Sequence, residues 1–292
     1  MDRTKILCGL SALLFLAGCG GGPRPVVVGS KNFTEQVILG EITAQLLEHR
    51  LHQSVRRRLD LGGTLLAQEA LTSGQIDVYP EYTGTALTNV LKQPALADAA
   101  RTLAIVQSEY ARRFQLRWLN PLGFNDSFAM VIRGADARSH MLRTITDAAR
   151  CCMWRLGVGY EFLGRPDGLQ SLTTAYAALR MEGSPRSMDL GLLYRALQDK
   201  QVDLVAGNTT DGLLSKLDVV VLTDDSHAFP PYEASLVARE AALKLHPQME
   251  EALASLSGRI SDATMRKLNY EVDGNHRGVA EVAAEFLKEA GL

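Results

Sequence analysis

The sequence predicts an α/β protein built from two similar lobes that face each other across a cleft. Strand-like and helix-like segments alternate through most of the chain, which favours α/β layers with largely parallel sheets. A weak internal repeat is the second observation: Gln75-Ile76-Asp77-Val78 and Gln201-Val202-Asp203-Leu204 each follow a predicted helix and lead into a polar loop with threonine and glycine. The repeat could be a chance similarity, but two lobes with the same arrangement of strands and helices explain it better. Ligands of open α/β sheets lie at the carboxyl ends of strands, so loops 83–84 and 210–212 would border the cleft.

The amino-terminal residues are typical of a bacterial export signal. A basic start precedes an apolar run at 6–17 that is too short to span a bilayer. The run leads into Leu-Ala-Gly-Cys, so we expect residues 1–18 to be removed and Cys19 to carry lipid at the periplasmic or extracytoplasmic face of a membrane. A plain secretory signal with an incidental cysteine is the alternative. Residues 19–25 would form a flexible tether.

Strands and helices are then expected in turn. The expected elements are a strand at 25–29, a helix begun by a capping box of Asn32 and Glu35, a strand at 55–61 with the solvated basic run 56–58, a helix capped by Thr64 that reaches residue 73, and a strand at 76–79 that ends at Pro80. From Met249 onward, apolar residues recur at helical spacing, and these helices should pack on the first lobe. We expect the first lobe at 26–125 and 230–292 and the second at 126–229, with two crossings.

The remaining cysteines and the charges narrow the possible functions. Cys151 and Cys152 are neighbours, and because a bond between neighbours strains the backbone, two buried thiols are favoured, although the sequence leaves this open. The net charge of −2, with both signs scattered, argues against a nucleic-acid surface. No catalytic or phosphate-binding motif is present, and His49 and His52 fit a solvent-facing pair better than a zinc site. We therefore expect no enzyme, metal or cofactor, and take residues 165–168 as a turn or interlobe contact.

Aromatic residues are scarce, at 6% of the chain, so their positions are informative. Six of them fall in or next to loops that follow predicted strands: Tyr79, Tyr82, Phe124, Phe128, Phe229 and Tyr232. A single such ring is more often a core residue than a ligand contact, but three aromatic loops together favour a binding site. Ring faces suit a quaternary ammonium, which has no N–H to donate. Three rings would contribute roughly 2–6 kcal/mol to its binding.

Seven stretches, in order along the chain, resemble the osmoprotectant-binding proteins of glycine betaine, carnitine and choline ABC importers. They are GSKNFTEQ (29–36), LGGT (61–64), VYPEYTGT (78–85), GFNDSFAM (123–130), FLGRPDG (162–168), NTTDG (208–212) and FPPYE (229–233). The resemblance implies a two-lobed type II periplasmic-binding-protein fold whose interlobe cleft closes over an aromatic cage. It also implies a monomer that delivers a quaternary-ammonium ligand to permease and ATPase subunits. A binding protein for another polar solute, such as ergothioneine or an amino acid, and a sensor subunit without transport are the alternatives.

The same resemblance assigns the cage residues. Tyr82 and Tyr232 match cage tyrosines, and Phe128 stands where relatives usually have tyrosine in GFNNTYAL. Asn208 stands where many relatives carry a further aromatic residue. This departure predicts an incomplete cage, weaker betaine binding, or a ligand that needs a hydrogen bond there.

Three polar residues complete the expected site. Thr85 and Gln36 are candidates for the polar end of the ligand, with a helix cap and a solvated first-turn residue as their respective alternatives. Asn125 could contact ligand, but we expect it to shape its own turn. Which solute is physiological is left open by the sequence.

Overall fold

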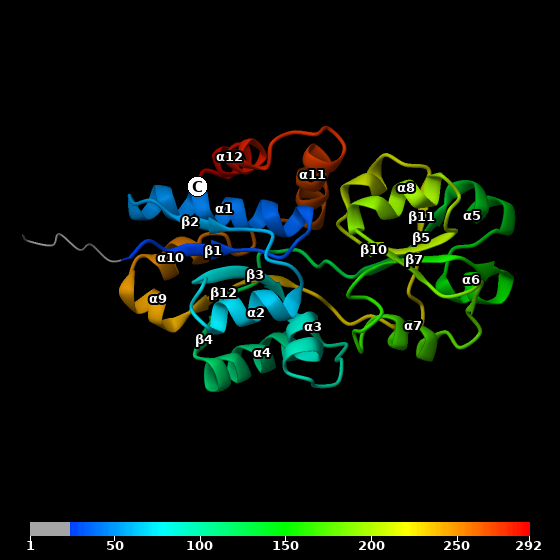
Figure 1. Cartoon of the computed structure of the whole chain (residues 1–292), viewed down its shortest axis with the longest axis horizontal. Coiled ribbons are helices and arrows are strands. Elements are labelled where there is room, and N and C mark those ends of the chain that lie inside the picture. Colours follow the sequence, from blue (N-terminus) through cyan, green and yellow to red (C-terminus); the bar gives the residue numbers. More distant parts are fainter. Residues whose placement is uncertain (1–23) are drawn as a thin grey trace, which may run out of the picture.

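The computed structural model describes residues 24–292 as two α/β lobes lying side by side (Figure 1). Within these residues each lobe has one five-stranded sheet. The first lobe has the strand order β2 (Arg56–Arg58), β1 (Val27–Gly29), β3 (Val78–Tyr82), β12 (Ala234–Arg239) and β4 (Leu116–Trp118). The second has the order β11 (Val219–Leu222), β5 (Phe128–Arg133), β10 (Leu204–Asn208), β7 (Leu156–Gly159) and β9 (Arg186–Met188). A small sheet pairs β6 (Met153–Trp154) with β8 (Arg180–Met181).

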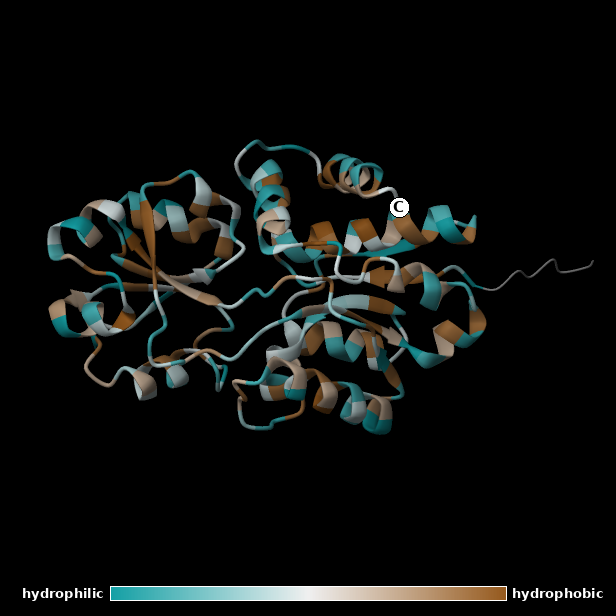
Figure 2. Ribbon diagram, turned by 180° about the vertical axis from the view of Figure 1, so that it is seen from behind, coloured by the Kyte–Doolittle hydropathy of each residue, from teal (hydrophilic) through white to brown (hydrophobic). Residues whose placement is uncertain are grey.

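Helices cover the sheets of both lobes (Figure 1). Those of the first lobe are α1 (Thr34–Leu51), α2 (Thr64–Thr72), α3 (Thr83–Thr85), the π-helix η1 (Ala86–Val90), α4 (Ala99–Phe114), α9 (Glu240–Leu245), α10 (Met249–Ala254), α11 (Asp262–Asp273) and α12 (Val279–Ala290). Those of the second are α5 (Gly134–His140), α6 (Ile145–Cys151), α7 (Leu169–Ala175), the 3₁₀ turns η2 (Leu190–Leu192) and η3 (Gly212–Ser215), and α8 (Leu193–Gln198). In Figure 2 the central strands of the second lobe are mostly hydrophobic, whereas many outward helix faces of both lobes are hydrophilic.

The two sheets follow one plan, as the internal repeat predicted. Each central strand, β3 or β10, has a parallel neighbour on one side, β1 or β7, and an antiparallel neighbour on the other, β12 or β5. The aspartate before each central strand binds an arginine at the end of the antiparallel neighbour: Asp77 binds Arg239, and Asp203 binds Arg133. The helix–strand units that resemble each other in sequence therefore occupy equivalent places in the two lobes.

Three local expectations in the first lobe were wrong. Helix α1 begins after Phe33 with no side-chain cap, because Glu35 is buried and bonds to distant residues instead of closing a capping box. Gly63, not Thr64, precedes α2. Strand β3 continues through Pro80 to Tyr82, and this proline is tolerated because β1 pairs with β3 only at Val78. The basic run 56–58 does form an exposed edge strand, as expected.

The carboxyl-terminal helices pack mainly on the first lobe. Helices α10 and α12 lie against α1, and α11 also contacts α1. However, α11 reaches the second lobe as well, where it packs against η3. A Cβ atom on Gly212 would lie 2.3 Å from the backbone nitrogen of Tyr270, so this contact needs glycine. No helix in residues 24–292 is long and apolar enough to cross a membrane.

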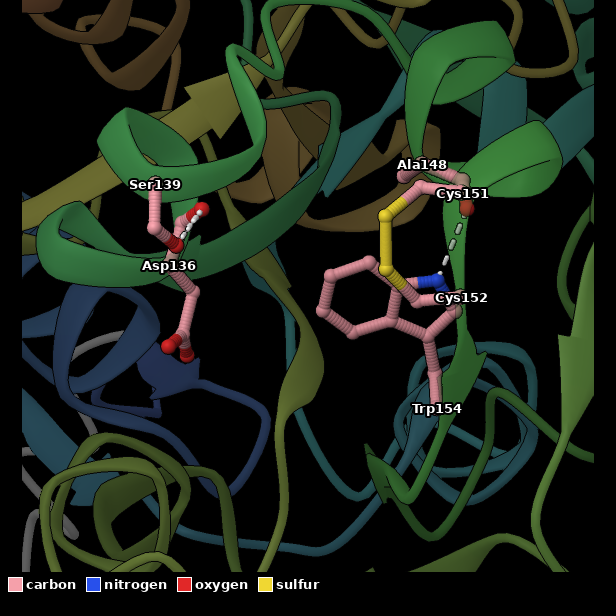
Figure 3. The surroundings of a disulfide bond; sticks show 6 residues. All are labelled: Asp136, Ser139, Ala148, Cys151, Cys152 and Trp154. Carbon is pink, nitrogen blue, oxygen red and sulfur yellow. Dashed lines mark hydrogen bonds between the residues drawn. A yellow bond between two sulfur atoms is a disulfide. The ribbon is translucent and has the colours of Figure 1, made fainter.

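Cys151 and Cys152 form a disulfide between neighbours, so the expectation of two buried thiols was wrong (Figure 3). Helix α6 ends at Cys151, and Cys152 is fully extended (φ −142°, ψ 171°), which brings the two side chains together. Both residues are half-buried. The indole Nε1 of Trp154 donates to the carbonyl of Ala148, 2.9 Å away, and ties the next strand to the same helix (Figure 3).

Candidate functional site

A cavity of about 310 Å³, the interlobe cavity, lies between the two lobes. Four of its lining residues stand at the ends of strands. Tyr82 ends β3, Asn208 ends β10, Phe128 begins β5, and Gly159 ends β7. Because β5 runs antiparallel to β10, its first residue lies at the same sheet edge as the last residue of β10. The two matching lobes thus direct one edge of each sheet into a shared space.

Five of the seven residues expected at the site line this cavity. They are Tyr82, Thr85, Phe128, Asn208 and Tyr232. Their contact with a ligand stays a prediction. Thr85 does not cap a helix with its side chain; its hydroxyl accepts a hydrogen bond from Arg165 instead.

The other two expected residues are not part of the cavity wall. Gln36 is fully buried, so its alternative as a solvated residue was wrong, and its Oε1 accepts from the backbone nitrogen of Lys31 at 3.3 Å. Asn125 Oδ1 accepts from the backbone nitrogen of Tyr232 at 2.6 Å. Asn125 therefore shapes the chain that carries Tyr232.

The aromatic wall has two parts. Around Phe128, ring centroids lie 4.9 Å from Phe162, 5.4 Å from Phe229 and 5.7 Å from Tyr232. Across the cavity, Phe33 and Tyr82 are nearly parallel at 6.4 Å. The sequence reasoning missed Phe33 and Phe162, although each follows a strand, β1 or β7, in the same way as the residues that it singled out. Tyr79, Phe124 and Phe229, by contrast, are buried but are not among the residues that line the cavity.

Two cations lie among the rings, each paired with its own carboxylate. Lys31 Nζ is 2.5 Å from Glu81 Oε1 and 4.9 Å from the ring centre of Tyr82. Arg165 lies 2.7 Å from Asp167 and 5.0 Å from the ring centre of Phe128. Both ion pairs are buried. The pKa of Asp167 is lowered: burial acts to raise it, but the bonds and charge of Arg165 outweigh that effect.

Hydrogen bonds join the lobes around this cavity. Asp167 accepts from the hydroxyls of Thr88 (2.9 Å) and Tyr232 (2.8 Å), so the stretch 165–168 is an interlobe contact as expected. Glu161 of the second lobe accepts from the backbone nitrogen of Thr64, 2.8 Å away, at the start of α2. A carboxylate from one lobe therefore satisfies a free N–H at the first turn of a helix of the other.

A pair of carboxyl groups lies at one end of the interlobe cavity. Asp126, which lines the cavity, and Glu35, which lies behind it, both bond to the hydroxyl of Thr210. We call Glu35 and Asp126 the acid pair. Burial raises the pKa of Glu35 to about 7 and that of Asp126 well above its usual value. The residues of the acid pair were not identified as site residues from the sequence.

Among residues 24–292, His140, Cys151 and Cys152 bring possible metal-ligand atoms within 4.8 Å of one another. The two sulfurs are bonded to each other, so neither is a thiolate that could bind a metal. This group also lies apart from the interlobe cavity, whose lining does not include it.

Comparison with known proteins assigns the fold and the family. The family model described as the substrate-binding domain of ABC-type glycine betaine transport systems matches residues 24–289. A glycine-betaine-binding protein of Pseudomonas aeruginosa is 36% identical over all of this chain and 96% of its own length. The ergothioneine permease and binding protein EgtU of Helicobacter pylori is 34% identical over 92% of this chain, which spans about half (48%) of that larger protein.

A solved structure agrees. The crystal structure titled as a glycine betaine/carnitine/choline ABC transporter superposes with a TM-score of 0.75 at 30% identity, covering 91% of this chain and 98% of the other. The fold is the expected two-lobed type II periplasmic-binding-protein fold, and the resemblance identified from the sequence motifs is confirmed. The chain belongs to the family of substrate-binding proteins of ABC-type glycine betaine transport systems.

Proposed function

We propose that this protein binds a small quaternary-ammonium solute in the interlobe cavity and delivers it to the permease and ATPase subunits of an ABC importer. The observation that carries the proposal is the aromatic wall at the strand ends. Phe33, Tyr82, Phe128 and Tyr232 line the cavity from both lobes. Ring faces attract a cation that cannot donate hydrogen bonds, at about 0.5–2 kcal/mol for each well-placed ring.

The polar part of the wall supports a ligand with two unlike ends. Lys31, Arg165 and Thr85 lie in the lining of the same cavity. Glycine betaine and carnitine carry a carboxylate, and choline carries a hydroxyl, so each presents an acceptor to such donors. The ammonium end would face the rings while the acceptor end faces Thr85 and the two cations.

Titration calorimetry with glycine betaine, choline, carnitine, proline betaine, ergothioneine and ordinary amino acids tests this proposal. We expect at least one quaternary amine to bind with micromolar or lower Kd, and Phe128→Ala to weaken it at least fivefold. Phe114→Leu, which changes a ring outside the cavity, serves as the matched control. Binding of ordinary amino acids alone would contradict the proposal.

Asn208 supports a second candidate, a ligand with a polar group on the ammonium side. Its backbone nitrogen donates to Asp211, 2.7 Å away, while its side chain lines the cavity and has no hydrogen-bond partner within residues 24–292. A side-chain amide offers two donors and an acceptor but no ring face. Ergothioneine, which adds an imidazole-derived ring to a trimethylammonium group, belongs to this class. Comparison of its Kd with that of betaine in the same titrations separates the two candidates.

We infer that lobe closure reports loading to the transporter. Arg165 and Asp167 of the second lobe bond to Thr85, Thr88 and Tyr232 beside the cavity, so a ligand there can contact both lobes only when they are together. Such a ligand shifts the population toward the closed form. Transport assays with and without the cognate permease distinguish an importer subunit from a sensor that binds solute without transport.

The proposed lipid anchor, Cys19, lies outside the described residues. Cys19→Ser should give an unprocessed precursor that stays in the aqueous phase of a detergent partition, whereas the wild type enters the detergent phase. A Ser variant that is processed and partitions like wild type would contradict the anchor. Gel filtration of the soluble part tests the expected monomer.

A further inference from the structure

We propose that Asp126 is a specificity-determining residue that favours ligands with a net positive charge over zwitterions, and that a proton shared with Glu35 through Thr210 tunes this preference. The proposal rests on the function proposed above and narrows its substrate class. It depends on three features of the structure: the geometry of the acid pair, the charges around it, and the position of Asp126 in the cavity wall.

The geometry requires a proton on the acid pair. Thr210 Oγ1 lies 2.6 Å from Glu35 Oε2 and 2.6 Å from Asp126 Oδ1. A hydroxyl has one proton, so it can donate to only one of these oxygens. The second short contact is a hydrogen bond only if the other carboxyl group donates to the hydroxyl. One proton therefore has to reside on Glu35 or Asp126 in this arrangement, which joins the two lobes.

The surroundings supply hydrogen-bond donors but no cation. Glu35 accepts from the hydroxyl of Tyr82 (2.6 Å) and from Asn269 Nδ2 (3.0 Å), and Asp126 accepts from the backbone nitrogen of Thr210 (3.3 Å). The titratable groups that influence the acid pair from neighbouring elements are Tyr82 on β3, Tyr194 on α8, Asp211 after β10 and, through Asp211, Asp273 on α11. Within residues 24–292 neither member of the acid pair forms a salt bridge.

The two cations of the cavity cannot balance this charge, because each is already paired. Lys31 is neutralised by Glu81, and Arg165 by Asp167. Two carboxylates that are close, buried and without a counter-ion do not both ionise readily. Burial, followed by the mutual repulsion of the acid pair, raises the pKa of Asp126, and burial raises that of Glu35 to about 7.

A ligand in the cavity meets Asp126 directly. Its Oδ1 is used by Thr210, whereas Oδ2 has no hydrogen-bond partner in the described part of the chain, and the residue lines the cavity. A ligand with net charge +1 supplies the missing counter-ion and favours full ionisation of the acid pair. A zwitterion also brings a carboxylate into the same small cavity, and the repulsion between this group and Asp126 offsets much of the attraction between Asp126 and the ammonium group.

Proton linkage follows with a definite sign. If a cationic ligand favours the ionised acid pair, its binding releases a proton. Because Glu35 has a pKa of about 7, the affinity for that ligand should rise as pH rises through this value. Release of one proton limits the rise to tenfold per pH unit. A zwitterion should show a smaller change.

The experiment compares choline, a net cation, with glycine betaine, a zwitterion, by titration calorimetry between about pH 6 and about pH 8. Wild type should bind choline roughly three- to tenfold more tightly at the higher pH and release protons, measured from the dependence of the binding enthalpy on the buffer. Asp126→Asn should weaken choline about tenfold at the higher pH, leave betaine within about threefold, and remove the pH dependence. Glu35→Gln removes the repulsion that Glu35 exerts on Asp126, so it should reduce the pH dependence of choline binding.

The controls keep these outcomes distinct. Glu182→Gln makes the same change in net charge at an exposed site in the second lobe and should behave as wild type. Circular dichroism and thermal melts show whether each variant folds; if Asp126→Asn does not, the wild-type proton release and Glu35→Gln still decide. Equal loss of choline and betaine in Asp126→Asn, or choline binding without proton release, would overturn the proposal. Failure of wild type to bind any quaternary amine would instead overturn the proposed function, and this inference with it.

Discussion

The two lobes end their central strands with different side chains at equivalent positions. Tyr82 ends β3 in the first lobe and Asn208 ends β10 in the second, and each lies five positions after the aspartate that precedes its strand, Asp77 or Asp203. Both side chains line the interlobe cavity. The shared sheet plan thus fixes where a side chain enters the cavity, while residue identity fixes whether it presents a ring face or an amide.

The same comparison holds at the opposite ends of these strands, where the two aspartates differ in burial. Asp77 is almost fully buried and accepts from Arg24, Arg239 and the backbone nitrogen of Val27. Asp203 accepts from Arg133 and Arg155 and is 19% exposed. The aspartate of this equivalent ion-pair site is therefore drier in the first lobe than in the second, whereas the arginine partners of both are partly exposed.

The largest effect should come from removing these aspartates. Asp77→Ala leaves the buried backbone nitrogen of Val27 and two partly exposed arginines without their acceptor and should cost about 2–4 kcal/mol of unfolding free energy, whereas Asp203→Ala should cost about 1–3 kcal/mol. Urea unfolding followed by tryptophan fluorescence separates the lobes, because Trp118 lies in the first and Trp154 in the second. Trp118→Phe and Trp154→Phe backgrounds isolate each signal. Equal costs for the two variants would show that burial does not distinguish these sites.

Truncation of the residues that end the strands should affect binding unequally. Tyr82→Ala should weaken a trimethylammonium ligand by about 1–2 kcal/mol, roughly 5- to 30-fold, and Asn208→Ala by less. Calorimetry measures both. Tyr82→Phe is the matched control: it keeps the ring but removes the hydroxyl that donates to Glu35, so it should cost much less than Ala. A Phe variant as weak as the Ala variant would assign the contact to the hydroxyl rather than the ring.

The next test places a tyrosine at the end of β10, as at the end of β3, and measures the effect on ligand affinity. Asn208→Tyr should tighten glycine betaine by about 0.5–2 kcal/mol if the new ring reaches a good geometry. The same change should weaken a ligand whose polar group needs the amide, because a buried polar group left unpaired costs about 1–3 kcal/mol. Titration of both proteins with one set of ligands measures both effects. Identical affinities for every ligand would mean that Asn208 does not contact the solute.

The smallest effect concerns pH. Hydrogen bonds from Arg155, and then from Arg133, lower the pKa of Asp203 to about 2. Because the folded pKa is below the unfolded value, Asp203 contributes stability at neutral pH that is lost as pH falls from about 4 to about 2. The contribution should stay under about 1 kcal/mol, since the group is partly exposed. Asp203→Asn should flatten the acid dependence of the Trp154 signal; an unchanged slope would contradict the assignment.

The two-lobed fold and several residues of the cavity wall could be predicted from the sequence. Aromatic loops beside predicted strands pointed to Tyr82, Phe128 and Tyr232, and the family resemblance added Asn208; all four residues line the cavity. Side chains whose role depends on distant partners could not be predicted. Glu35 looked like half of a capping box, but it lies against Thr210 and Asn269, 175 and 234 positions away in the chain. No local pattern carries that information.

Asp126 illustrates the same limit. It lies between two residues that the sequence reasoning considered, Asn125 and Phe128, yet only the packing of the lobes shows that it lines the cavity. Gln36 shows a related limit: its place in the first turn of α1 allowed a solvated side chain, but the residues around it exclude solvent completely. Its contact with a ligand stays a prediction.

The contact between Gly212 and Tyr270 has a mechanical consequence. Two chain crossings alone leave two bodies free both to bend about the line that joins the crossings and to twist around it. Helix α11 adds a third point of support, since it packs on η3 while Asn269 Nδ2 donates to the carbonyl of Thr210. We infer that this support suppresses the twist and leaves one rotation. The angle between the two lobes would then alone decide whether a solute can enter. A bulky residue at position 212 would change this angle in the empty protein without altering any group that touches the solute.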